Sequence, residues 1–159
     1  MQKICDAFER ACNKEFGFLT AEHGLKVMNT SKDTYGCYVT YCNDVVAVKV
    51  SYEIKDGGLF VMVCRMVNGK LPPEEIFVRS DTVLNSFDLE DVVALKEPSI
   101  ELEQNFADPS KPTAKELETN LRIYAKALKT YAKDILGGDF SSFADLEKIV
   151  KRRANVLKE

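Results

Sequence analysis

Apolar and polar side chains alternate with period two between residues 35 and 67, and two breaks divide this stretch into three runs. The runs are Tyr35–Cys42, Val45–Lys55 and Leu59–Val67. The breaks, Asn43-Asp44 and Lys55-Asp56-Gly57-Gly58, consist of residue types that tolerate tight turns. Alternating runs separated by turns predict three antiparallel strands joined as a β-meander.

The middle run indicates what its two faces contact. Its alternate residues are apolar, and the residues between them are polar: Val46, Val48, Val50, Tyr52 and Ile54 against Lys49, Ser51 and Glu53. One covered face and one wetter face are typical of an antiparallel sheet backed by helices. The third run is apolar on both faces, which predicts a central place in the sheet. Two shorter strands, Leu25–Asn29 and Glu75–Ser80, are expected to complete a sheet within residues 25–80.

Helical periodicity flanks this sheet on both sides. Within residues 1–20, four apolar side chains recur on one helical face: Cys5, Phe8, Cys12 and Phe16. Residues 86–112 are expected to hold a short helix, Phe87–Leu95, and then an irregular acidic segment interrupted by prolines. Thr113 and Glu116 have the spacing of a capping box, and two helices are expected within residues 113–159.

These patterns predict one α+β domain spanning residues 1–159. It consists of an N-terminal helix, an antiparallel meander of four or five strands, and C-terminal helices packed on one sheet face. The long helix carries an apolar seam made of Leu117, Leu121, Tyr124, Leu128, Tyr131 and Ile135. Such a seam more often packs on its own sheet than on a partner. Both a monomer and a homodimer remain open.

Charge is distributed unevenly along the chain. The net charge is −3, yet residues 74–108 alone contain ten Asp/Glu and only two Lys/Arg. An acidic stretch repels nucleic-acid phosphates and attracts basic partners. The basic run near the C-terminus, Lys148 to Arg153, suits the end of a helix and lacks interleaved aromatic residues. We therefore expect a protein partner and no nucleic-acid partner.

Candidate chemistry is sparse. The five cysteines include no CxxC pair, and the expectation is that they are reduced and mostly buried. A disulfide framework or a metal site is the alternative reading. His23 has no recognisable nucleophile motif near it, and we expect a surface or capping histidine. We expect no catalytic residue, metal or cofactor, and the absence of a visible signal peptide or membrane span favours the cytoplasm.

The acidic segment is the main candidate for function, because its carboxylates are interspersed with apolar residues. Apolar anchors rimmed by one sign of charge are typical of protein interfaces, although a solvated, loop-rich flank would also explain the composition. The candidate partner-binding residues are Asp81, Phe87, Asp88, Glu90, Asp91, Glu97, Glu101 and Glu103.

Two short segments carry a resemblance. Glu15-Phe-Gly-Phe-Leu19 before the meander and Ile135-Leu-Gly-Gly-Asp-Phe-Ser-Ser-Phe143 between two helices resemble small uncharacterised bacterial α+β proteins. Some of those proteins resemble immunity proteins of contact-dependent or polymorphic toxin systems. The resemblance implies a non-catalytic module that neutralises a basic toxin by binding it. A secretion chaperone or adaptor for an effector segment is the alternative, and a small enzyme with an unrecognised site is a third.

Overall fold

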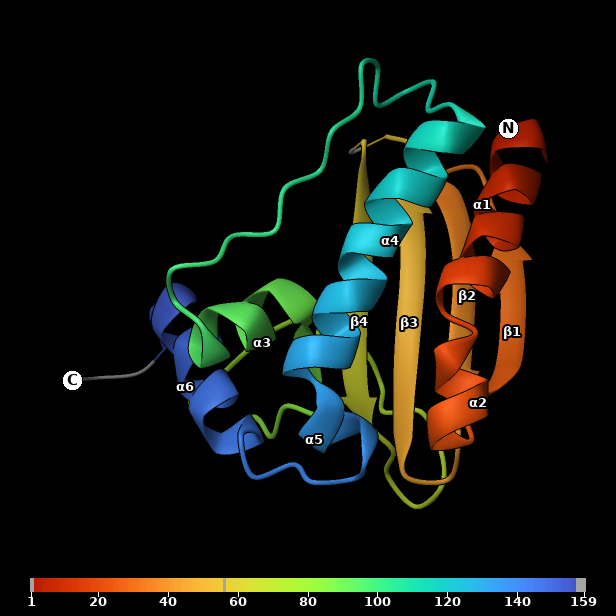
Figure 1. Cartoon of the computed structure of the whole chain (residues 1–159). Helices are drawn as coiled ribbons and strands as arrows, with labels where there is room; N and C mark the ends of the chain where they lie inside the picture. Colours follow the sequence, from red (N-terminus) through yellow and green to blue (C-terminus); the bar gives the residue numbers. More distant parts are fainter. Residues whose placement is uncertain (1, 56, 157–159) are drawn as a thin grey trace.

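A computed structural model describes residues 2–55 and 57–156 and has two layers, an antiparallel sheet and helices on one of its faces (Figure 1). The strands follow chain order, β1-β2-β3-β4-β5. They are β1 Lys26–Lys32, β2 Gly36–Cys42, β3 Val46–Glu53, β4 Gly58–Arg65 and β5 Ser86–Asp88. The helices are α1 Gln2–Glu15, α2 Phe18–His23, α3 Leu89–Lys96, α4 Ala114–Tyr131, α5 Lys133–Leu136 and α6 Phe143–Arg153. The predicted α+β fold is confirmed.

The alternation predicted for the meander decides which sheet face is buried. Val48 lies between Tyr41 on β2 and Val63 on β4, and all three side chains are buried. The residues that alternate with them on β3, such as Lys49 and Ser51, are partly exposed. A one-residue slip would move every apolar side chain to the wet face, so this pattern specifies the register.

The far edge of the sheet differs from the prediction in two ways. No strand forms over Glu75–Ser80; instead β5, Ser86–Asp88, pairs with Met62–Cys64 of β4. As a result β3 is the central strand, and β4 lies next to the edge despite its two apolar faces. The apolar outer face has another cause, because residues 66–85 turn back across it. Ala47 and Cys64 on that face are fully buried, and Lys49 and Met62 share a groove with residues 73–75.

A glutamine side chain takes the place of a strand partner at Leu59, near the start of β4. The Gln104 amide accepts a hydrogen bond from Leu59 N at 2.7 Å and donates one to Leu59 O at 2.8 Å. Gln104 also donates to the Tyr124 hydroxyl, which in turn donates to Glu90, each at 2.7 Å. The buried Asn120 side chain bonds the backbone of Asn105 in both directions. The irregular segment between α3 and α4 is therefore held against β4 and α4.

Local chemistry accounts for the start of α4 and the end of α2. The capping box of α4 is present, because the Thr113 hydroxyl accepts from Glu116 N while the Glu116 carboxylate accepts from Thr113 N. Gly24 ends α2 in the left-handed conformation, with φ of 69°. The α4 seam packs inside the molecule: Leu117, Leu121, Tyr124, Leu128 and the following Ile135 are buried, and Tyr131 is partly buried. Intramolecular packing of this seam is confirmed.

The expectation of reduced cysteines is wrong for two of the five. Cys5 of α1 and Cys37 of β2 form a disulfide with 5.4 Å between their Cα atoms, and Cys12, Cys42 and Cys64 are free. Sequence spacing alone gave no reason to pair them, because 32 residues separate them and only the packing of α1 on β2 brings them together. Such bonds persist in oxidising compartments and are rare in the cytosol, so the cytoplasmic location stays a prediction. Within the described ranges, none of the helices has the length and apolar character needed to cross a membrane.

Candidate functional site

A groove of about 390 Å³ lies where the loop after β4 returns across the open face of the sheet. The loop forms one wall, the open face contributes Lys49 and Met62, and α6 contributes Val150 and Arg153. Four carboxylates line it, from Glu74, Glu75, Asp88 and Asp91. The groove therefore combines apolar walls with a surplus of negative charge, in the part of the chain where the sequence predicts a binding surface.

The loop is fixed to α6 by hydrogen bonds between its backbone and two α6 side chains, Lys151 and Glu147, which also form an ion pair with each other. Lys151, only 6% exposed, donates to the backbone carbonyl of Ser80 at 2.8 Å and lies 3.4 Å from the Glu147 carboxylate. Glu147 accepts from the backbone N–H of Leu84 at 2.9 Å. Breaking such a pair leaves an uncompensated buried charge, so these contacts hold the base of the loop against α6.

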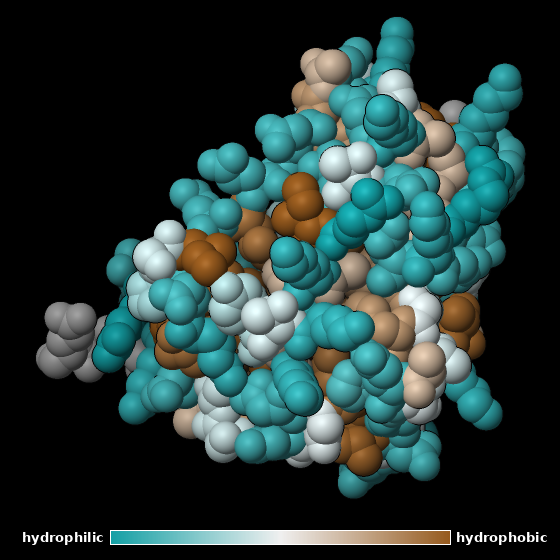
Figure 2. Space-filling view, viewed as in Figure 1, coloured by the Kyte–Doolittle hydropathy of each residue, from teal (hydrophilic) through white to brown (hydrophobic). Residues whose placement is uncertain are grey.

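The tip of the same loop presents the most exposed large apolar side chains of the described residues. Ile76 is 84% exposed and Phe77 is 77% exposed, while Val83 at the other end of the loop is 64% exposed. Ile76 and Phe77 lie between Glu75 and Val78, which both line the groove. The helix-covered side of the molecule, by contrast, is mostly hydrophilic with small, separated hydrophobic patches (Figure 2).

The carboxylates of β5 and α3 differ in whether another side chain of the protein already donates a hydrogen bond to them. Arg153 of α6 donates to the buried Asp91 carboxylate, and the Tyr124 hydroxyl donates to Glu90. Asp88 has no such partner: burial, then the neighbouring Asp91 and Glu90 charges, raise the pKa of its carboxyl. No basic side chain within residues 2–55 and 57–156 lies within 4.0 Å of the Glu74, Glu75 or Asp88 carboxylate.

The structure divides the predicted binding residues into separate groups. Asp88 and Asp91 line the groove, and Asp81 is exposed on the loop beside it. Glu97, Glu101 and Glu103 are exposed outside the groove, on the segment that leads from α3 to the start of α4 (Figure 1). The predicted acidic residues therefore do not converge on a single surface.

Phe87 corrects the expectation of a surface anchor. It is 1% exposed, and its ring packs on Phe143 with 4.7 Å between the ring centroids. Its position on β5 opposite Val63 turns it toward the helices. The exposed apolar residues are instead Ile76, Phe77 and Val83, in a stretch where the β-prone run Ile76-Phe77-Val78 had predicted a strand. The signal that could have identified them is Pro72-Pro73, because two consecutive prolines cannot donate to a strand ladder.

We call the set Glu74, Glu75, Ile76, Phe77, Val83 and Asp88 the loop-and-groove surface. It offers exposed apolar anchors beside carboxylates that are free to accept hydrogen bonds from Lys or Arg of another molecule. This arrangement can bind a protein, and it contains no nucleophile paired with a general base.

The nucleophilic side chains elsewhere are poorly suited to chemistry. Burial raises the pKa of the Cys12 and Cys64 thiols, which disfavours the reactive thiolates. Burial and the Glu90 carboxylate likewise raise the pKa of the Tyr124 hydroxyl. In the described part of the chain, no three His, Cys, Asp or Glu side chains are grouped so that they could hold a metal ion.

Comparisons with known proteins add no assignment to this surface. No protein-family model, curated protein or solved structure matches the chain.

Proposed function

We propose that this chain is a non-catalytic protein-binding module that docks a basic protein through the loop-and-groove surface. The observation that carries the proposal is the exposure of Ile76 and Phe77, 84% and 77%, next to carboxylates without a basic partner. A soluble monomer gains nothing from exposing a Phe in this way, whereas burial of such a side chain in a partner pocket supplies a large part of binding energy.

The rigid base of the loop supports the same function. Because Lys151 and Glu147 hold residues 80 and 84 against α6, part of the ordering cost of binding is met before the partner arrives. The carboxylates beside the tip would contribute mainly to association rate and to selection of basic partners. A toxin domain whose basic active face is covered by this surface is the partner that the sequence resemblance implies.

The secretion chaperone is the weaker candidate. A chaperone of this kind would present a sheet and a helix seam to an effector segment, and the α4 seam is buried within the molecule. An enzyme is weaker still, because the groove holds carboxylates and two cations but no nucleophile with an orienting base.

The test requires a neighbouring gene that encodes a basic toxin-like domain, and it measures binding of this chain to the product of that gene. Phe77→Ser should weaken the complex by about 30-fold, since an interface hot spot contributes roughly 2 kcal/mol. The double change Glu74→Lys and Glu75→Lys should slow association and reduce its dependence on salt. Surface plasmon resonance at two salt concentrations gives both rate constants.

Matched control variants lie outside the surface. Ile100→Ser changes a side chain that is also exposed, and the double change Glu101→Lys and Glu103→Lys reverses the same amount of charge on the α3–α4 segment. Both should leave affinity unchanged. If the controls weaken binding and the loop variants do not, the docking surface is elsewhere and the proposal is wrong.

A further inference from the structure

The outer edge of β1 is open along its whole length. All seven residues of β1 are exposed, and β1 pairs only with β2. At the opposite edge of the sheet, β5 pairs with Met62–Cys64 of β4, and the Gln104 amide bonds the backbone of Leu59. An uncovered strand presents unpaired N–H and C=O groups to any extended chain that approaches it.

Strand alternation identifies which backbone groups of β1 point outward. Asp33 N donates to Gly36 O at 3.0 Å and closes the β1–β2 hairpin. Since bonded and non-bonded pairs alternate in an antiparallel ladder, Ser31 bonds Tyr38, whereas Thr30 and Lys32 direct their N–H and C=O groups away from β2. These outward groups can bond an additional strand without breaking a bond of the fold.

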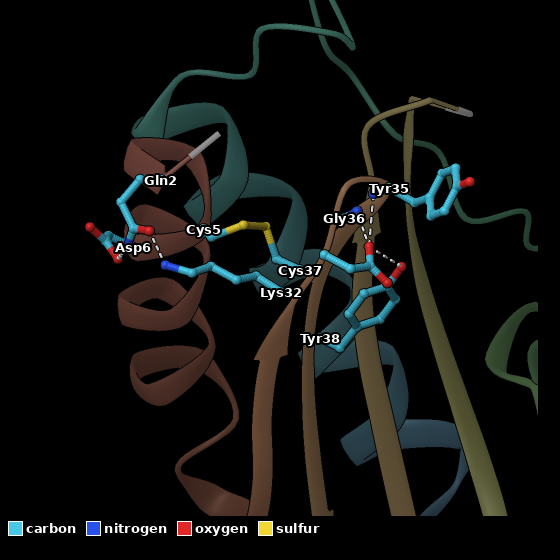
Figure 3. The surroundings of a disulfide bond; sticks show 9 residues. Gln2, Cys5, Asp6, Lys32, Tyr35, Gly36, Cys37 and Tyr38 are labelled. Atoms are coloured by element: carbon cyan, nitrogen blue, oxygen red, sulfur yellow. Dashed lines mark hydrogen bonds between the residues drawn. A yellow bond between two sulfur atoms is a disulfide. The ribbon is translucent and has the colours of Figure 1, made fainter.

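A groove of about 380 Å³ runs beside this edge, between α1 and β1. Gln2, Asp6 and Glu9 of α1 line one side, and residues 30–32 of β1 line the other. The Cys5–Cys37 disulfide joins α1 to β2 beside this groove, and Lys32 of β1 donates to the Gln2 side chain of α1 (Figure 3). An added strand would direct alternate side chains into this groove, which is how peptides bind between an edge strand and a helix.

The charge of β1 indicates the chemistry of the added strand. Its sequence includes Lys26 and Lys32 and no acidic residue. Within the described chain, neither lysine lies within 4.0 Å of a carboxylate, and the Asp6 carboxylate nearby accepts from Gln2. In an antiparallel β1–β1 junction, a second copy of the chain would place Lys32 near Lys26 at each end, with no acid in either strand, which is unfavourable.

We infer that β1 accepts an acidic, extended segment of another protein as a sixth strand. The register between β1 and β2 sets the length of the added segment. Met28 of β1 has no partner on β2, so six residues of β2, 37 to 42, pair with β1. A six-residue segment therefore places its two ends opposite Lys32 and Lys26, on the helix-covered face and on the open face respectively. This surface lies at the other end of the sheet from the loop-and-groove surface and does not depend on it.

The test uses two fluorescein-labelled peptides of defined sequence, Asp-Thr-Val-Thr-Val-Asp and Lys-Thr-Val-Thr-Val-Lys. Fluorescence polarisation should show about tenfold tighter binding of the acidic peptide than of the basic one. The acidic peptide gains two exposed ion pairs with Lys26 and Lys32, whereas the basic peptide is repelled by the same two lysines. Thr30→Pro removes one outward N–H and should abolish binding, whereas Thr30→Val keeps the N–H and should bind normally. Phe77→Ser, which tests the proposed function, should bind the acidic peptide like the wild type.

Amide hydrogen exchange on the wild-type protein provides a second readout that needs no variant. The acidic peptide should slow exchange of the Thr30 and Lys32 amides, because a new strand bonds those groups. The inference is overturned by equal affinity for the two peptides, by no binding up to about 1 mM, or by protection confined to other elements. It is also overturned if light scattering shows a dimer that Thr30→Pro dissociates, since a second copy then occupies the edge.

Discussion

The disulfide between α1 and β2 leads to a quantitative prediction about stability. Cys5 and Cys37 are separated by 32 residues, and closing a loop of that length in the unfolded chain corresponds to about 3.7 kcal/mol of chain entropy. Because α1 also packs on the sheet through the buried Phe8 and Cys12, and the buried Phe16 follows directly after the helix, the reduced protein should still fold. Reduction should therefore lower the free energy of unfolding without abolishing the native state.

Urea denaturation followed by far-UV circular dichroism measures this effect. With a denaturant slope of about 2 kcal/mol/M, the unfolding midpoint should fall by about 2 M when a phosphine reductant is added. The double variant Cys5→Ala and Cys37→Ala should show a similar low midpoint and no response to the reductant. Thiol titration in denaturant should find the three free cysteines before reduction and all five after it.

Cys42→Ala is the matched control, since it removes a free, partly exposed thiol. It should unfold within about 0.5 kcal/mol of the wild type and remain sensitive to reductant. Two results would refute the reasoning: five titrating thiols in the unreduced protein, or a midpoint that reduction leaves unchanged.

Three further predictions concern the polar side chains of Gln104, Lys151 and Asp88. Gln104→Leu leaves both backbone groups of Leu59 without a partner and should cost about 2–4 kcal/mol of unfolding free energy in urea. Lys151→Met breaks the contact of α6 with the loop after β4 and should speed amide exchange in residues 79–84, whereas the exposed Lys148→Met should not. Because the pKa of the Asp88 carboxyl is raised in the folded protein, ionisation of this group lowers the stability of the fold at pH values above that pKa and has no effect at acid pH. Asp88→Asn should therefore raise the stability at pH 7, and this gain should vanish below about pH 4.

Each of these predictions can fail in a specific way. An unchanged urea midpoint for the Gln104 variant would mean that water replaces the amide along β4. Equal exchange rates in the two lysine variants would mean that the loop is held by other contacts. The Asp88 effect should be small, because the side chain keeps access to solvent, and a gain that is constant from pH 3 to pH 8 would assign it to something other than ionisation.

The sequence alone determined the elements whose signals are local. Period-two alternation depends only on neighbouring residues, so β2, β3 and β4 and the buried face of β3 could be predicted. The same holds for α4, whose capping box is contained in four consecutive residues, and for the burial of its seam. These signals do not depend on which distant segment covers the strands and the helix, because any covering layer removes an apolar face from water.

Tertiary structure decided which segments meet. The run Ile76-Phe77-Val78 has strand-like composition, yet Ser86–Asp88 occupies the edge of β4 and leaves that run in an exposed loop. The pairing of Cys5 with Cys37, the contact of Arg153 with Asp91 and the Gln104 amide on β4 all join residues far apart in the chain. Such contacts depend on how the layers pack as a whole, and residue spacing carries no record of that geometry. For the same reason the acidic residues, clustered in sequence, are divided between the groove and the α3–α4 segment.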